Sequence, residues 1–337
     1  MQNSDAISVA RMLNRVLCFG AAGWAKALLR RAHHRSARVM VGTLRFAHPT
    51  ALIAQSRQGD DSGIAIRIES RIMPPRPTIL VFDSGLGGLT VLREVVAARG
   101  DAHFIYVADD AFFPYGHHSE QAIVDRVVPL IGDLISQHAP DLVVIACNTA
   151  STLVMSHLRA AYAVPFVGTV PAIKPACALS KTRRVSVLGT KGTVQREYTR
   201  GLIRDFAGGC EVTLVGSPKL AALAEHALSG GTVLDRDIAA ELAPCFVGDP
   251  AEVTARTDTI VLACTHYPLL LDRLISLAPW EVAWIDPAPA IARRASELLG
   301  PPVGALDQAG AEMIFTSNKP HTLSQALTPF FGGRVPA

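Results

Sequence analysis

The sequence predicts an α/β protein with two similar domains, in which mainly parallel sheets are flanked by helices. From Thr78 onward, short runs rich in Val and Ile alternate with helix-like segments, which is the pattern of parallel sheets covered by helices. The chain has 337 residues and 49% of them are hydrophobic, so it is long enough for two domains with cores of their own. Pro165, Pro171 and Pro175 cluster mid-chain and indicate a crossover between the domains.

Eight apolar runs are expected to form strands, and each is followed by a helix-like segment or a turn. In chain order they are ILVFD (79–83), HFIYVA (103–108), LVVIAC (142–147), PFVGT (165–169), RVSVLGT (184–190), EVTLVG (211–216), TIVLAC (259–264) and EVAWID (281–286). We expect a first α/β domain of residues 77–171 plus 281–337 and a second of residues 172–280.

Residues 1–76 differ from the rest in composition. They hold twelve Lys or Arg and four Asp or Glu, a net charge of +8, and since the whole chain carries +3 the remainder carries −5. We expect a basic N-terminal extension that is either a poorly ordered appendage or a stretch upstream of the natural start that adds nothing to function. A membrane-surface or regulatory segment is the alternative, because the stretch up to Arg31 is amphipathic.

The remaining composition excludes several classes of protein. An acidic body argues against a nucleic-acid partner, and no apolar run reaches the ~18 residues of a membrane span. The N-terminus carries no convincing secretory signal. The cysteines form no Cys-x-x-Cys pair, so we expect reduced thiols and a cytoplasmic protein. They are Cys18, Cys147, Cys177, Cys210, Cys245 and Cys264.

Two of these cysteines stand at the ends of expected strands in matching surroundings. VVIACNTA (143–150) and IVLACTHYP (260–268) each run from aliphatic residues through Ala-Cys into polar residues. Ligands bind beyond the carboxyl ends of strands in open parallel sheets, so Cys147 and Cys264 are expected to face each other in one site. A single strand cysteine is more often inert packing, but two in the same context favour chemistry.

Zinc binding and pyridoxal chemistry are the first alternatives for such a site. Cys264 and His266 are zinc ligands by type, but no second Cys/His pair has the spacing of a zinc site. No lysine closes an apolar strand in the way that the cysteines do, so a Schiff base is not indicated. We expect neither a metal nor a cofactor.

The stretch FDSGLGGLT (82–90) predicts a strand, a glycine-rich turn and a helix start. Its glycines lack the G-x-G-x-x-G spacing of a dinucleotide site, and Asp83 would repel a pyrophosphate. Backbone N–H groups at the helix start suit a carboxylate, and Asp83 suits a cation. Uncharged donors recur elsewhere, at Pro114–Gly116, Asn148, Thr149 and Thr265. This inventory indicates an amino acid as the ligand.

Two acid/bases on opposite sides of the α-carbon of an amino acid define a racemase. One thiolate removes the α-proton, and the other thiol protonates the opposite face. A free thiol has a pKa near 8.5, and lowering it by ~1.5 units, or about 2 kcal/mol, supplies thiolate at neutral pH. We expect His266 to assist Cys264 and Asp83 to assist Cys147, although either side chain could instead cap a helix.

Four motifs together resemble those of the glutamate racemases over about residues 78–300. They are FDSGLGGLTV (82–91), PYG (114–116), ACNTAS (146–151) and ACTHYPLL (263–270). The resemblance implies a two-domain fold of the aspartate/glutamate racemase type with the active site at the domain interface. It also implies cofactor-independent interconversion of L-glutamate and D-glutamate, which supplies D-glutamate for peptidoglycan synthesis.

The resemblance further implies roles for individual residues. Cys147 and Cys264 would be the two acid/bases, and Asp83 and His266 would assist them. Glu225, in SPKLAALAEHA (217–227), matches a family glutamate that contacts the substrate. The other implied substrate contacts are Asp83, Ser84, Pro114, Tyr115, Gly116, Asn148, Thr149, Thr265 and His266.

Other functions stay open at this point. An aspartate or broad-specificity racemase would use the same two thiols, so the resemblance rather than the spacing selects glutamate. A related decarboxylase or isomerase is a further alternative, but a decarboxylase of this fold class typically retains only one of the two cysteines. A two-lobed binding protein for amino acids needs no thiol pair. The sequence also leaves open whether the protein is a monomer or a homodimer.

Overall fold

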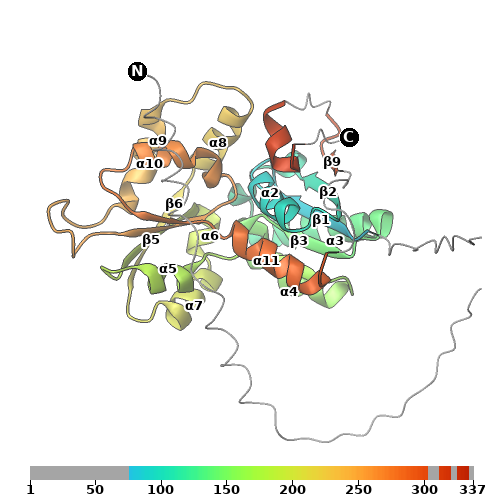
Figure 1. The fold of residues 1–337 in the computed structure, drawn as a ribbon, viewed down its shortest axis with the longest axis horizontal. Helices are drawn as coiled ribbons and strands as arrows, with labels where there is room; N and C mark the ends of the chain where they lie inside the picture. Colours follow the sequence, from blue (N-terminus) through green and yellow to red (C-terminus); the bar gives the residue numbers. More distant parts are fainter. Residues whose placement is uncertain (1–75, 303–310, 320–324, 334–337) are drawn as a thin grey trace, which may run out of the picture. The chain divides into compact units, whose positions relative to one another are not determined.

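The computed structural model describes residues 76–302, 311–319 and 325–333, which belong to one compact unit. Residues 1–75, and with them the predicted basic extension, lie outside the described residues. The described part contains two parallel sheets with helices packed on their faces (Figure 1). The predicted α/β class with parallel sheets flanked by helices is therefore confirmed.

The first sheet has the strand order β4-β3-β1-β2-β9, and every neighbouring pair is parallel. Its strands are β1 (Thr78–Asp83), β2 (His103–Ala108), β3 (Leu142–Ile145), β4 (Phe166–Gly168) and β9 (Ala311–Phe315). Its helices are α2 (Leu89–Ala98), α3 (Glu120–His138), α4 (Asn148–Ala161) and α11 (Ala288–Leu299), with the short turns η1 (Asp110–Phe112), η2 (Tyr115–His117) and η5 (Gln325–Phe331).

Successive residues of β1 point to opposite faces of the first sheet, and each face has its own hydrophobic cluster. Ile79 and Val81 pack in the cluster with residues of α2 and α11, the two helices that lie side by side in Figure 1. Leu80 and Phe82 pack in the cluster with residues of α3 and α4. This is the period of two that a strand buried on both faces requires.

The second sheet has the strand order β6-β5-β7-β8, again with parallel pairs throughout. Its strands are β5 (Arg184–Thr190), β6 (Glu211–Ser217), β7 (Thr259–Ala263) and β8 (Ala283–Ile285). Its helices are α5 (Ile173–Leu179), α6 (Lys191–Gln195), α7 (Glu197–Phe206), α8 (Leu220–Leu228), α9 (Asp235–Leu242) and α10 (Leu271–Ser276), with the turns η3 (Ala243–Cys245) and η4 (Tyr267–Leu270). Val185 and Val187 pack with α5 and α7, and Leu188 packs with α8 and α9 on the other face.

All eight predicted strands are present, and one strand was not predicted. β9 pairs with β2 at the edge of the first sheet, and its five residues are only half-buried. An edge run that carries Glu312 has too weak an apolar pattern to be recognised as a strand. The second sheet ends with β8, and α11 then packs on the first sheet. The division of the chain into two domains at 171 and 281 stays a prediction.

No helix within the described ranges is long and apolar enough to cross a bilayer. The carboxyl ends of β1, β3 and β7 carry Asp83, Cys147 and Cys264 respectively, at or within two residues of the strand end. Ligands bind beyond such strand ends in parallel sheets, so these three residues mark the candidate site.

Candidate active site

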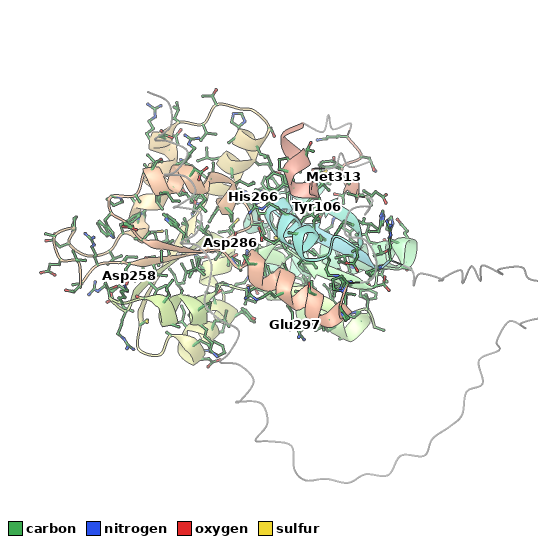
Figure 2. The ribbon with its side chains drawn as sticks, in the orientation of Figure 1. Tyr106, Asp258, His266, Asp286, Glu297 and Met313 are labelled. Atoms are coloured by element: carbon green, nitrogen blue, oxygen red, sulfur yellow. The ribbon has the colours of Figure 1, made fainter. Side chains whose placement is uncertain are left out.

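The turn after β1 holds Asp83 in a fully buried position. The backbone N–H of Gly85 donates to Asp83 Oδ2 (3.1 Å), and the hydroxyl of Tyr106 donates to the carbonyl of Gly85 (2.7 Å). Tyr106 and His266 are labelled in Figure 2. A Cβ atom at Gly87 would lie 2.3 Å from His266 Nδ1, so the close approach of this imidazole requires glycine. The glycine-rich turn is thus shaped to pack against residues that follow β7.

Cys147 follows β3 and caps the N-terminus of α4. The backbone N–H of Ala150 donates to its Sγ (3.5 Å), and the thiol donates to Ser84 Oγ (3.6 Å). A helix N-terminus favours negative charge on the capping atom. This position therefore suits a thiol that must ionise during a reaction.

Cys264 directly follows β7 and has an imidazole beside it. Its Sγ lies 3.9 Å from Nδ1 of His266, and Nε2 of His266 lies 3.0 Å from Oε2 of Glu225. Glu225 also accepts the backbone N–H of Leu86 (2.8 Å), so it fixes the imidazole and the glycine-rich turn together. A carboxylate at one ring nitrogen orients the other nitrogen toward the sulfur.

Thr265 joins the end of β7 to the turn after β1. Its hydroxyl donates to Asp83 Oδ1 (3.2 Å), and its carbonyl accepts the hydroxyl of Thr90 on α2 (3.1 Å). All three side chains are buried, so these bonds form away from competing water. They hold the ends of the two central strands together.

Tyr115 in the Pro-Tyr-Gly motif is held by a buried carboxylate. Its hydroxyl donates to Asp109 Oδ2 (2.6 Å), and Asp109 also accepts from Arg126 (2.6 Å) and Thr316 (2.5 Å). Burial disfavours the ionised form of Asp109, but the bonds from Arg126, Thr316 and Tyr115 outweigh burial and hold its pKa below the usual range. Asp109 is thus a charged anchor for the loop that carries Tyr115.

A pocket with a volume of about 20 Å³ lies among these elements. Ten of the predicted site residues line it. They are Ser84, Pro114, Tyr115, Gly116, Cys147, Asn148, Thr149, Cys264, Thr265 and His266. Both cysteines are nearly buried, at 4% and 6% exposure. The pocket therefore has two thiols, an imidazole and several uncharged donors on its wall, which is the equipment for proton transfer to and from a small polar molecule.

Comparison with known proteins identifies the family. The sequence profile of the Asp/Glu/Hydantoin racemase family matches residues 81–295. The chain belongs to this family. A glutamate racemase of Sinorhizobium fredii is 54% identical over 75% of this chain and 95% of that protein. One of Brucella abortus is 51% identical over 78% of this chain and 95% of that protein. The resemblance to the glutamate racemases that the motifs indicated is confirmed. The expectation that the protein is a racemase is confirmed as well.

Solved structures of the family have the same fold. The Escherichia coli glutamate racemase, determined in complex with L-glutamate and the activator UDP-MurNAc-Ala, is 41% identical with a TM-score of 0.64 and covers 71% of this chain and 89% of that one. The Thermus thermophilus glutamate racemase, in complex with β-chloro-D-alanine, is 28% identical with a TM-score of 0.59 and covers 78% and 95%. The racemase fold thus extends over most of the described residues.

Two of the predicted site residues do not line the pocket. They lie behind residues that do. Asp83 reaches the wall through the Thr265 hydroxyl, and Glu225 reaches it through the His266 imidazole. Substrate contact by both residues, and assistance of Cys147 by Asp83, stay predictions. In the structure both residues contact side chains that line the pocket, an arrangement that suits orienting roles.

Three residues that the sequence analysis does not predict also line the pocket. They are Phe113, Thr190 and Ala221. Thr190 ends β5, and its Oγ1 lies 3.1 Å from Oγ1 of Thr149. The rule that ligands bind at the carboxyl ends of parallel strands could have identified Thr190, because LGT closes a predicted strand. No sequence signal marked Phe113 or Ala221.

Burial dominates the acid–base properties on the Cys147 side of the pocket. Burial raises the pKa of Asp83 to about 6, although His266 and the N–H groups of Gly85 and Gly88 oppose the rise. Burial, reinforced by the charge of Asp83, also raises the pKa of Cys147 to about 12. This differs from the expected lowering, because in the closed pocket the loss of hydration outweighs the helix N-terminus. Cys147 is therefore a thiol at neutral pH.

The Cys264 side has the opposite character. Burial disfavours the imidazolium of His266, but its contacts with Cys264 and Glu225 outweigh burial and raise the pKa of His266 well above its ordinary value. A protonated imidazole therefore lies beside the sulfur of Cys264. The pocket thus has a neutral thiol on one wall and a sulfur with a cationic neighbour on another.

Proposed function

We propose that the protein is a glutamate racemase that interconverts L-glutamate and D-glutamate by proton transfer between Cys147 and Cys264. The observation that carries the proposal is that both sulfurs line one pocket while they come from the ends of central strands in two different sheets. The names of the relatives, at more than half identity, support glutamate as the substrate.

The reaction has two proton transfers. The Cys264 thiolate, with the His266 imidazolium beside it, takes the α-proton, and the electron pair of the broken C–H bond stays on the α-carbon. The thiol of Cys147 then donates its proton to the opposite face, which leaves Cys147 as the thiolate. The two sulfurs have exchanged protonation states, and this state performs the reverse reaction.

Uncharged donors are suited to bind the α-carboxylate during these steps. Asn148 and Thr149 line the pocket at the N-terminus of α4, where the helix dipole favours an anion, and Ser84, from the turn after β1, lines it next to Cys147. Asp83 and Glu225 act from behind the wall, through Thr265 and His266. The proposed steps use neither a metal ion nor a cofactor.

The protein must open to admit its substrate. A volume of about 20 Å³ is enough for roughly one water molecule, and an amino acid is several times larger. Closure around the substrate would remove water from the reacting carbon and strengthen the charge interactions inside. The structure is therefore interpreted as the closed form of the site.

The proposal extends to the cellular role. The D-glutamate made would be used for peptidoglycan, as the family resemblance implies. The five cysteines in the described ranges are all free thiols, which supports a reducing compartment such as the cytoplasm.

The test is chiral analysis of the product in heavy water. Purified protein with L-glutamate and no added cofactor should yield D-glutamate that carries deuterium at the α-carbon. L-Aspartate in a parallel reaction distinguishes a broad-specificity racemase. Unlabelled and unchanged L-glutamate would contradict the proposal and favour a binding protein.

A further inference from the structure

Because the pocket is closed, the contacts beside it decide how often it opens. Two groups of hydrogen bonds join elements of the first sheet to elements of the second. One group runs from the β1 turn and α2 to Thr265 and Glu225. The other group, on the side of α4, includes a buried cation that the proposed reaction does not use.

This second group centres on Thr149. Its Oγ1 lies 3.1 Å from Oγ1 of Thr190 and 3.3 Å from Oγ1 of Thr193. Arg196, which stands between α6 and α7, donates from Nη1 to the carbonyl of Thr149 and to Thr152 Oγ1 (2.6 Å). One guanidinium nitrogen from the second sheet's helices thus bonds to two residues in the first turns of α4.

The interactions that Arg196 makes with its partners differ in strength. Its Nε lies 3.3 Å from Oε1 of Glu120, but the side chain of Glu120 is 67% exposed, and an exposed ion pair contributes little. The side chain of Arg196 is only 5% exposed, so the bonds that its guanidinium donates to α4 are charge-assisted and shielded from water. Burial lowers the pKa of Arg196, while the charge of Glu120 opposes the shift.

The bonded residues lie next to the reacting group. Thr149 lines the pocket and stands two positions after Cys147, whose Sγ caps the same helix turn. We propose that Arg196 is a positioning residue that fastens the α6–α7 connection to the first turns of α4 and so holds the pocket closed with Cys147 in place. The inference rests on the proposed function only in treating this pocket as the place of reaction.

Alkylation of the cysteines measures closure without turnover. The ligand-free full chain is treated with iodoacetamide, and the rate at each cysteine is followed by peptide mass spectrometry. Cys147 and Cys264 line the pocket, whereas Cys245 is fully buried in the core of the second sheet and serves as an internal control. Arg196→Met removes the charge and keeps an unbranched side chain. Arg204→Met, on the exposed face of α7, is the matched control.

Arg196→Met should raise the alkylation rate of Cys147 and of Cys264 about tenfold, which corresponds to ~1.4 kcal/mol. Cys245 should react at the wild-type rate, and Arg204→Met should change no rate. Arg196→Lys restores one charged donor and should return both pocket rates to within about threefold of wild type. Loss of a positive charge near Cys147 would by itself reduce thiolate and slow alkylation, so a faster rate reports opening.

Unchanged pocket rates in Arg196→Met would overturn the inference. A rise at all three cysteines together would overturn it too, because Arg196 would then stabilise the whole fold. If Arg196→Met does not fold, Thr152→Val removes one acceptor and should give a smaller rise restricted to the pocket cysteines; no rise there would count against the proposal. None of these results depends on racemisation, so failure of this inference would leave the proposed function standing.

Discussion

Replacing Asp83 with Asn should stabilise the protein at neutral pH but not at acid pH. Asp83 is fully buried, and its pKa is raised from 3.8 to about 6. Between these values the native state holds a proton that the unfolded chain has lost. The stability that this proton provides is present in full below about pH 4 and is lost as the pH rises through about 6.

The magnitude follows from the size of the pKa shift. A shift of roughly 2 units corresponds to about 3 kcal/mol in total, of which roughly 2 kcal/mol is lost between about pH 4.5 and 7.5. Asn has the same shape and never ionises. Its amide oxygen can accept the N–H of Gly85, and its amide nitrogen can donate to the hydroxyl of Thr265, so both hydrogen bonds can be kept.

The assay is urea unfolding of wild type and Asp83→Asn at several pH values across that range. The free energy of unfolding of the variant minus that of wild type should rise by roughly 2 kcal/mol from the lowest pH to the highest. Asp205→Asn, at an exposed position of α7, should follow wild type, because an exposed side chain loses little hydration on folding. A difference that stays constant or falls with rising pH would refute the reasoning.

Three further substitutions test other contacts. Glu225→Gln removes the charge opposite His266 and should lower the pKa of His266 in an NMR titration; an unchanged pKa would exclude the pairing. Asp109→Asn weakens the hold on the Tyr115 hydroxyl and should raise KM for glutamate about tenfold. An unchanged KM in this variant would show that Asp109 does not influence substrate binding. The hydroxyl of Ser151 is buried without a partner among the described residues, so Ser151→Ala should increase the free energy of unfolding by about 1 kcal/mol, and a decrease would contradict this.

The strands and the location of the site could be predicted because both follow from local patterns. Val- and Ile-rich runs buried on two faces are visible in the sequence, and residues at the carboxyl ends of parallel strands converge on one edge of each sheet. Cys147 and Cys264 were found in this way, and both line the pocket. β9 was missed because an edge strand that is half-buried has little apolar pattern.

The remaining features depend on packing between distant segments. Arg196 reaches α4 only because the helices of the two sheets meet there, and Asp109 anchors Tyr115 with the help of Thr316, more than 200 residues away. The direction of the pKa shift of Cys147 could not be predicted from the sequence either. A helix N-terminus can be predicted from the chain, whereas the burial that outweighs it depends on how completely the pocket closes.

The most direct test of the two-base reaction compares racemisation by Cys147→Ser and Cys264→Ser with that of wild type. Cys177→Ser, at a half-buried position on α5 that does not line the pocket, is the control. Each pocket variant should lose about 10²- to 10⁴-fold in kcat/KM for both enantiomers of glutamate, with the circular dichroism spectrum unchanged, because a serine hydroxyl cannot replace either acid/base. The control should keep wild-type activity. Retention of most activity by either pocket variant would contradict the assignment of one proton transfer to each sulfur.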